Sequence, residues 1–233
     1  MSSPIWIVRG PNGNMLDFTD VIDKEDNYIQ SWATIIKFWN FEPVKLLTQG
    51  ERVTDRGIAI LTLELAFFEP FGSILTGQDS DGKSQKTFSE GLKYFSNWLF
   101  SKELIGEKEC DILSVIGTSS SPNIVYSYAR CGLMHKMTMQ GSNVFVDAFG
   151  IGDYAITDFN YKIKSQNKNG SLEPSKNIFL IDPWRLLPLL EQFMDFFVEE
   201  LIKSKQNGDD LYINFKNTFE RTIVGPGKTY LDR

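Results

Sequence analysis

Apolar residues recur at intervals of three and four along most of this 233-residue chain, a spacing typical of one face of an α-helix. The stretch GIAILTLELAFF is apolar nearly all round, which predicts a helix at the centre of the core. Pro70 and Gly72 follow and are expected to kink or end this helix. The spacing predicts helices over about 20–39, 56–68, 88–100, 122–137, 183–203 and 211–223.

Two of these helices begin with a polar residue followed by proline. Ser121 precedes Pro122, and Asp182 precedes Pro183. A side-chain oxygen at the first position accepts hydrogen bonds from the free amides of the first turn. Proline is tolerated next to it because no N–H is needed there. Pro188 lies early in the second helix, which is therefore expected to begin or bend at that residue.

Between these two helices the hydrophobic pattern changes to a period of two, which indicates strands. The alternation runs through 143–149 and 155–163, is interrupted at Gly150 and Gly152, and is followed by the short apolar run NIFLID. This pattern predicts a small antiparallel sheet of two or three strands over about 143–181.

The two ends of the chain differ from its middle. The stretch RGPNGNMLDF is rich in turn residues and predicts a short hairpin or loop, and about 224–233 is expected to be a loose tail. No repeat or break in composition divides the chain. The expected fold is therefore one mainly α domain over 1–233, a helical bundle with a small antiparallel β-insert (α+β).

Composition restricts the classes of protein that fit this chain. Hydrophobic residues make up 42% of it and charged residues 23%, which excludes an intrinsically disordered protein. Its two cysteines, Cys110 and Cys131, are too few for a disulfide scaffold. No stretch of about 18 apolar residues is without a charge or a proline, and MSSPIWIVRG has no export signal. We therefore expect no membrane association and a location in the reducing cytoplasm.

Charge and motif spacing narrow the chemistry further. A formal net charge of -6 disfavours a surface that coats nucleic acid non-specifically, although a local basic site remains compatible with it. GPGKT at 225–229 lacks the first glycine and the following helix of a phosphate loop. Asp79, Asp81 and Gly82 lack the closing glutamate of a calcium loop, and one histidine, His135, is too few for zinc. No metal or cofactor is expected.

The most informative stretch is YSYARCGLMHKM, in which four residues separate Arg130 from His135 near the end of the fourth predicted helix. Five positions on an ideal helix place two side chains about 140° apart, so these two flank one face only if the helix distorts or ends. Gly132 lies between them and favours such an end or a close helix contact. Histidine exchanges protons near neutral pH, and arginine holds two phosphate oxygens at once.

Arginine and histidine at this spacing in a helical domain resemble the signature of the HEPN superfamily (higher eukaryotes and prokaryotes nucleotide-binding). The order of RCGLMH, a short β-segment and the helix IDPWRLLPLLEQF is similar to the layout of uncharacterised bacterial HEPN-like proteins. The resemblance implies a helical fold, a homodimer whose two motifs face each other and, in active members, metal-independent RNA cleavage. It implies that Arg130 binds phosphate and that His135 transfers protons.

The resemblance also implies an acidic residue on a neighbouring helix. Glu64, the one charge within LTLELAFF, is the first candidate and Glu69 the second. One chain offers one histidine, so a site shared by two copies would supply both a base and an acid. The expected function is an endoribonuclease acting on RNA as a homodimer, in a defence or toxin-like role, with an antitoxin or another protein as a further partner.

Other interpretations stay open at this point. Arg130 can be a buried partner of Glu64, because a charge within an apolar helix is almost never left unpaired. His135 can cap the end of its helix, where a cation meets the negative end of the helix dipole. The chain is then a non-catalytic helical dimer that binds a protein or a nucleotide, as its acidic charge and Cys131 suggest, or a structural protein.

Overall fold

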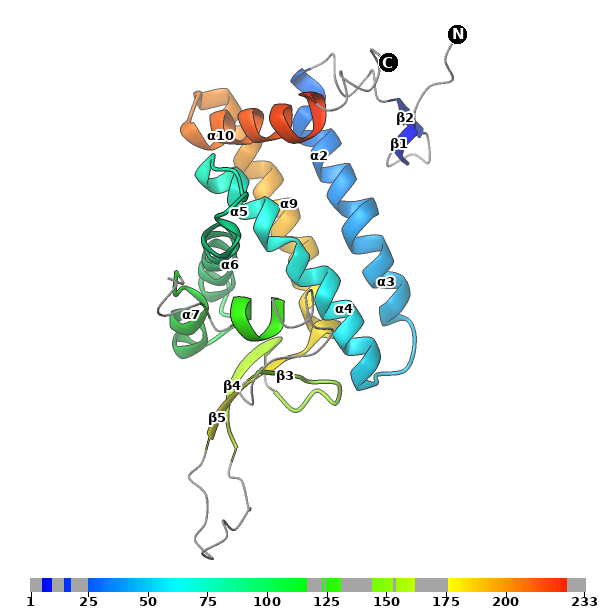
Figure 1. The fold of residues 1–233 in the computed structure, drawn as a ribbon, viewed down its shortest axis with the longest axis vertical. Helices are drawn as coiled ribbons and strands as arrows, with labels where there is room; N and C mark the ends of the chain where they lie inside the picture. The colour runs from blue at the N-terminus through cyan, green and yellow to red at the C-terminus, as the bar shows by residue number, and fades with distance from the viewer. Residues whose placement is uncertain are drawn as a thin grey trace, which may run out of the picture.

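The computed structural model describes residues 6–9, 15–17, 25–116, 123, 125–130, 144–152, 154–161 and 176–225. Over these ranges the chain is mainly helical, with a small sheet at one end of the helices (Figure 1), which confirms the expected fold class. The helical elements are η1 (Glu25–Asn27), α2 (Tyr28–Ile36), η2 (Lys37–Phe41), α3 (Glu42–Thr48), α4 (Thr54–Ala66), α5 (Phe68–Thr76), α6 (Ser84–Ser101), α7 (Glu107–Leu113), η3 (Val125–Arg130), α9 (Pro183–Asn207), α10 (Asp210–Phe219) and η4 (Glu220–Val224).

The first predicted helix is longer than its pattern indicated. From η1 to α3 the chain stays helical as far as Thr48, and α2 and α3 form one long rod in Figure 1. The turn η2 is a π-helix that lies directly before Glu42 and Pro43. Pro43 has no N–H to continue the usual ladder, and a π-turn is one of the ways a helix accommodates such an interruption.

The expectation that Pro70 interrupts the central helix is confirmed, because the break at Phe67 lies one turn before Pro70, which has no N–H for the carbonyl of Ala66; Gly72 does not end the helix. At Phe67 α4 ends and α5 begins, and α5 continues through both residues to Thr76. Pro70 lies in the first turn of α5, where the missing N–H has no intrahelical partner to lose. The helix ends instead at Gly77, whose φ of 64° is the left-handed conformation that glycine adopts most readily.

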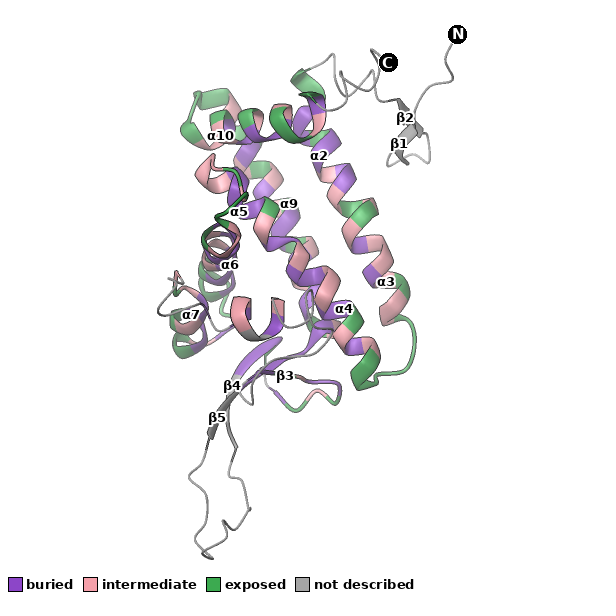
Figure 2. Cartoon of the chain, viewed as in Figure 1, coloured by how far each residue is buried: buried purple, intermediate pink, exposed green. Residues whose placement is uncertain are grey.

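Gly72 has a packing role between α5 and α6. A Cβ at this position would lie 1.7 Å from the carbonyl oxygen of Thr87, so the two backbones approach more closely than any side chain allows. Around this contact Phe71 packs edge-on against Phe193 and Phe197 of α9, with ring centroids 5.1 and 4.6 Å away. Figure 2 shows the buried positions gathered on the faces that these helices turn toward one another. Phenylalanines are thus prominent among the largest fully buried side chains of the core.

The fifth predicted helix begins where the sequence indicated. The side chain of Asp182 accepts hydrogen bonds from the amides of Trp184 and Arg185, and Pro183 occupies the first turn. Pro188 lies inside α9 without ending it, and the helix runs on to Asn207, beyond the predicted end near 203. The sixth predicted helix corresponds to α10 and η4. The short helix α7 was not predicted.

The sheet differs from the prediction in one respect. Its strands are β3 (Val144–Val146), β4 (Ile156–Tyr161) and β5 (Lys176–Ile181), in the order β3-β5-β4. The pair β4 and β5 is antiparallel as expected, but β3 and β5 are parallel. The residues between β3 and β4 form a wide loop rather than a tight hairpin, so β5 can enter between the two strands. The expectation of a purely antiparallel insert is therefore wrong.

The predicted N-terminal hairpin is confirmed by the antiparallel pair β1 (Trp6–Arg9) and β2 (Met15–Asp17). The predicted tail lies outside the described residues from 226 onward, as does the fourth predicted helix apart from 123 and η3. The segment Thr54–Thr76 is long and apolar enough to cross a membrane by composition, but 56% of its most apolar window is buried inside the fold. This burial is typical of the core helix of a soluble protein.

Candidate functional site

Arg130 is the last residue of η3, a short helix that packs against α4, α6 and β3. Asn123 fixes its start, because its Oδ1 accepts hydrogen bonds from the amides of Val125 and Tyr126 at 2.9 and 3.1 Å. The Nδ2 of Asn123 donates to the carbonyl of Val115 at 2.8 Å, which ties η3 to the end of the preceding segment. The position of Arg130 is therefore set by a capped turn.

The guanidinium of Arg130 forms an ion pair with Glu69, in the first turn of α5. The two side chains are 16% and 17% exposed, so the pair is largely shielded but still reaches solvent. The guanidinium also lies over the ring of Tyr126, 5.6 Å from its centroid, and the hydroxyl of Tyr126 donates to Ser84. A carboxylate and an aromatic face thus hold one arginine at the edge of the bundle.

Glu64, the first acidic candidate, lies elsewhere in the fold. Its side chain is fully buried near the end of α4, and neither carboxylate oxygen has a hydrogen-bond partner. Burial raises the pKa of Glu64 well above its usual value of 4.5, and the negative charge of Asp182 raises it further. The interpretation that Arg130 pairs with Glu64 is wrong, because the partner of Arg130 is Glu69.

The reason lies in helix geometry. Five positions separate the two glutamates, and the break at Phe67 falls between them, so they leave the helix pair on different sides.

His135 and Cys131 lie outside the described residues, so the distance between Arg130 and His135 stays untested. Over the ranges that the structure describes, no three histidine, cysteine, aspartate or glutamate side chains are grouped as metal ligands would be.

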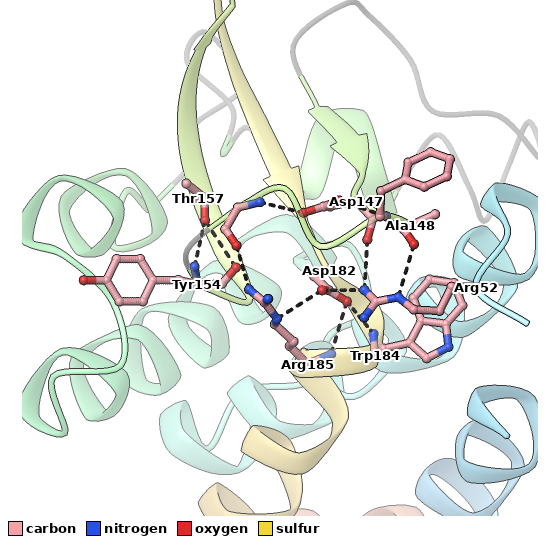
Figure 3. Close-up of polar contacts among 10 residues, drawn as sticks. Arg52, Asp147, Ala148, Tyr154, Thr157, Asp182, Trp184 and Arg185 are labelled. Carbon is pink, nitrogen blue, oxygen red and sulfur yellow. Dashed lines mark hydrogen bonds and ion pairs between the residues drawn. The ribbon is translucent and has the colours of Figure 1, made fainter.

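A second polar cluster, which the sequence did not predict, lies where the sheet meets α9 (Figure 3). Its centre is Asp182, whose fully buried side chain contacts two arginines. The Oδ2 of Asp182 lies 2.6 Å from Nη2 of Arg52 and 3.4 Å from Nε of Arg185. The guanidinium of Arg52 also lies 4.8 Å above the ring of Trp184. One carboxylate thus anchors two cations that are each about two-fifths exposed.

Both arginines also hold the loop that follows β3. Arg52 donates from Nε to the carbonyl of Ala148 at 3.1 Å, and Arg185 donates from Nη1 to the carbonyl of Gly152 at 2.6 Å. Inside this loop Asp147 accepts hydrogen bonds from the amides of Phe149 and Gly152. Burial favours the neutral acid, but these amides outweigh it and lower the pKa of Asp147. The two arginines therefore hold carbonyl groups of the loop, and the carboxylate of Asp147 holds its amide groups.

Sequence signals for this second cluster were present but scattered. From the sequence, Asp182 predicts only a helix cap. Gly150 and Gly152 predict only interruptions between strands. Arg52 lies 130 positions from Asp182, and no local pattern connects residues so far apart. An arginine a few residues before a predicted helix is an ordinary surface residue by sequence alone.

Comparisons with family models, with curated proteins and with solved structures found no significant match to this chain. Two described clusters concentrate charge, the pair of Arg130 with Glu69 and the group formed by Arg52, Asp182 and Arg185.

Proposed function

We propose that this chain is a metal-independent endoribonuclease that acts on RNA as a homodimer, with Arg130 and His135 at its centre. The observation that carries the proposal is the ion pair between Arg130 and Glu69 at the edge of the bundle. It combines the arginine of the motif, an acid on a neighbouring helix and access to solvent in one place. The resemblance to the HEPN superfamily implies the first two of these features.

The chemistry assigns a role to each residue. Cleavage through the ribose 2′-hydroxyl needs a base at that oxygen, an acid at the leaving 5′-oxygen and a cation at the phosphate. Arg130 supplies the cation, because its guanidinium stays charged and can contact two oxygens of one phosphate. His135 transfers the proton. In a homodimer the two copies of His135 act as base and acid in turn.

We assign the acidic role to Glu69 rather than to Glu64. Glu69 contacts Arg130 and orients its guanidinium, so it is a positioning residue. Glu64 has no solvent exposure and no hydrogen-bonded partner, and a group without access to RNA cannot exchange protons with it. We further propose that the protein works in the cytoplasm, in defence or as a toxin controlled by an antitoxin.

The test is cleavage of an end-labelled RNA oligonucleotide by the purified full chain in the presence of EDTA. We expect cleavage that leaves a 2′,3′-cyclic phosphate, and a loss of about 100-fold or more in rate for His135→Ala and for Arg130→Ala. Arg221→Ala is the matched control, because Arg221 is a half-exposed arginine paired with Asp79. It is expected to cut as fast as the wild type.

Two results would contradict the proposal. One is a folded wild-type protein that cuts no RNA in a panel of single-stranded and hairpin oligonucleotides. The other is a His135→Ala variant that cuts as fast as the wild type. Binding of RNA without cleavage would instead favour the non-catalytic interpretation of the same fold.

A further inference from the structure

The two arginines on Asp182 share one carboxylate. Arg52 and Arg185 carry two positive charges, and Asp182 supplies one compensating negative charge within ion-pair distance. The other acid in the cluster, Asp147, directs its carboxylate to backbone amides of its own loop (Figure 3). Among the described residues, the two guanidinium groups therefore share one partner carboxylate, and both side chains are partly exposed to water.

Each guanidinium keeps one nitrogen free for a further ligand. Arg52 uses Nε and Nη2 for the carbonyls of Ala148 and Asp147 and for Asp182, and no described contact engages its Nη1. Arg185 uses Nη1 for the carbonyl of Gly152 and Nε for Asp182, and no described contact engages its Nη2. The contacts with Asp182 and with the loop carbonyls fix both guanidinium groups. Each group keeps one nitrogen that no described residue contacts.

The two free nitrogens lie beside the same point, above Gly150. A Cβ on Gly150 would be 3.5 Å from Nη2 of Arg185 and 3.9 Å from Nη1 of Arg52. Gly150 has a φ of 70°, which favours glycine, and the absence of a side chain leaves this point open. A small anion in van der Waals contact with Gly150 on this side would lie close to a charged donor from each arginine.

We propose that Arg52 and Arg185 form a binding site for a phosphate group above Gly150. A tetrahedral anion with several oxygens fits two convergent guanidinium donors, and such charge-assisted hydrogen bonds are among the strongest that proteins make. The phosphate can belong to a small nucleotide or to a phosphodiester of RNA. Phe149, which precedes Gly150 and is 79% exposed, is the neighbouring aromatic side chain on which an attached base would stack under this proposal.

This site is independent of the proposed ribonuclease centre. None of its residues belongs to the pair of Arg130 and Glu69 or to the stretch that contains His135. Phosphate binding above Gly150 is therefore expected to survive in His135→Ala, so that a failure of RNA cleavage and a failure of phosphate binding can be told apart.

The test measures the melting temperature of the full chain in inorganic phosphate against chloride at equal ionic strength. We expect phosphate to raise the melting temperature of the wild type, because a ligand that binds only the folded state stabilises it. The decisive variant is Gly150→Asp. Aspartate tolerates a positive φ better than most residues, and its carboxylate would occupy the point between the two guanidinium groups. Phosphate affinity is expected to fall by about tenfold or more.

The matched control is Gly82→Asp, which introduces the same charge at another glycine with a positive φ of 65° and nothing within 4 Å. It is expected to keep the full response to phosphate. If Gly150→Asp does not fold, Arg185→Gln removes one of the two free donors while leaving Arg52 on Asp182. A wild type that does not respond to phosphate, or a Gly150→Asp variant that responds like the wild type, would overturn the proposal.

Two further ligands distinguish the source of the phosphate. AMP and a short single-stranded RNA are each titrated against wild type and Gly150→Asp in the same buffer. Tighter binding of AMP than of RNA identifies a nucleotide site. Tighter binding of RNA identifies a site for the phosphodiester backbone of RNA. In both cases the proposal requires the affinity to fall in Gly150→Asp.

Discussion

Two glutamates on consecutive helices of this protein meet opposite surroundings. Glu64, near the end of α4, is fully buried and has no hydrogen-bond partner for either oxygen. Glu69, in the first turn of α5, is paired with Arg130 and partly open to solvent. Both were candidates for the acid of the site, and burial in an apolar helix made Glu64 the more conspicuous one. An acid that contacts a cation and reaches solvent is therefore a better candidate for a functional site than an acid that is only buried.

Asp182 adds a third case to this comparison. It is as buried as Glu64, but two arginines and two backbone amides contact its carboxylate. Cations and amide donors favour the charged form of a carboxylate, so this buried acid has the partners that Glu64 lacks. If partners rather than burial decide how much each carboxylate adds to the stability of the fold, variants of these three acids should differ in the sign and size of their effects.

The largest effect on stability is expected for Asp182→Ala. This change removes the cap of α9 and the charge-assisted hydrogen bond to the partly exposed Arg52, which together contribute about 2–5 kcal/mol. The free energy of unfolding, measured by urea denaturation, should fall by that amount. Asp182→Asn, which keeps an acceptor for the cap, should lose less. An Asp182→Asn variant as stable as the wild type would mean that the ion pairs with the two arginines contribute nothing.

A smaller loss is expected for Glu69→Ala. Without Glu69 the largely shielded guanidinium of Arg130 loses a charged hydrogen-bond partner, which costs about 1.5–3 kcal/mol. Glu42→Ala is the matched control, because Glu42 pairs with Lys45 at an exposed site where such pairs contribute about 0.2–1 kcal/mol. A double-mutant cycle with Arg130→Ala isolates the pair itself, and a coupling energy near zero would show that no such pair forms.

The opposite sign is expected for Glu64→Leu. Leucine replaces a buried acid whose oxygens have no partner, and removing such a group is expected to raise the free energy of unfolding by about 1–3 kcal/mol at pH 7. Glu64→Gln keeps an unpartnered polar group and should gain less. A Glu64→Leu variant that is less stable than the wild type would show that Glu64 has a partner that stabilises it.

The smallest effect is a slope in the pH dependence of stability. Because the pKa of Glu64 is raised well above 4.5 in the folded protein, the folded state keeps a proton that the unfolded chain releases above that value. Stability should therefore fall as pH rises from about 4.5 toward the folded pKa, by at most about 1.4 kcal/mol per pH unit. The difference between wild type and Glu64→Leu isolates this slope. A difference that does not change with pH would rule out the raised pKa.

Much of the fold was predictable because its signals are local. The start of α9 at Asp182 and Pro183 follows from capping chemistry, and the apolar stripes of α6 and α9 follow from helical periodicity. The break at Phe67 follows from Pro70, which cannot donate to the carbonyl of Ala66, but the continuation of α5 through Gly72 to Thr76 was not predictable because it depends on packing against α6. The parallel pairing of β3 with β5 depends on tertiary packing and leaves no trace in the period of either strand.

The site was predictable only in part. Arg130 was identified by its spacing from His135, but the choice between Glu64 and Glu69 depends on which side of the helix pair each one faces. The cluster around Asp182 joins segments that are far apart in the chain, so its arginines could be recognised only in the folded protein. Sequence patterns report neighbours along one helix, whereas both charged clusters form between elements.

The most direct test of the central claim is the rate of RNA cleavage by Glu69→Gln and by Glu64→Gln, compared with the wild type at equal concentrations of folded protein. If Glu69 positions Arg130, its variant should lose about 10- to 100-fold in kcat, the size of effect typical of residues that orient a functional group. Glu64→Gln should stay within about twofold of the wild type. Loss of cleavage in Glu64→Gln, with Glu69→Gln unaffected, would contradict the account.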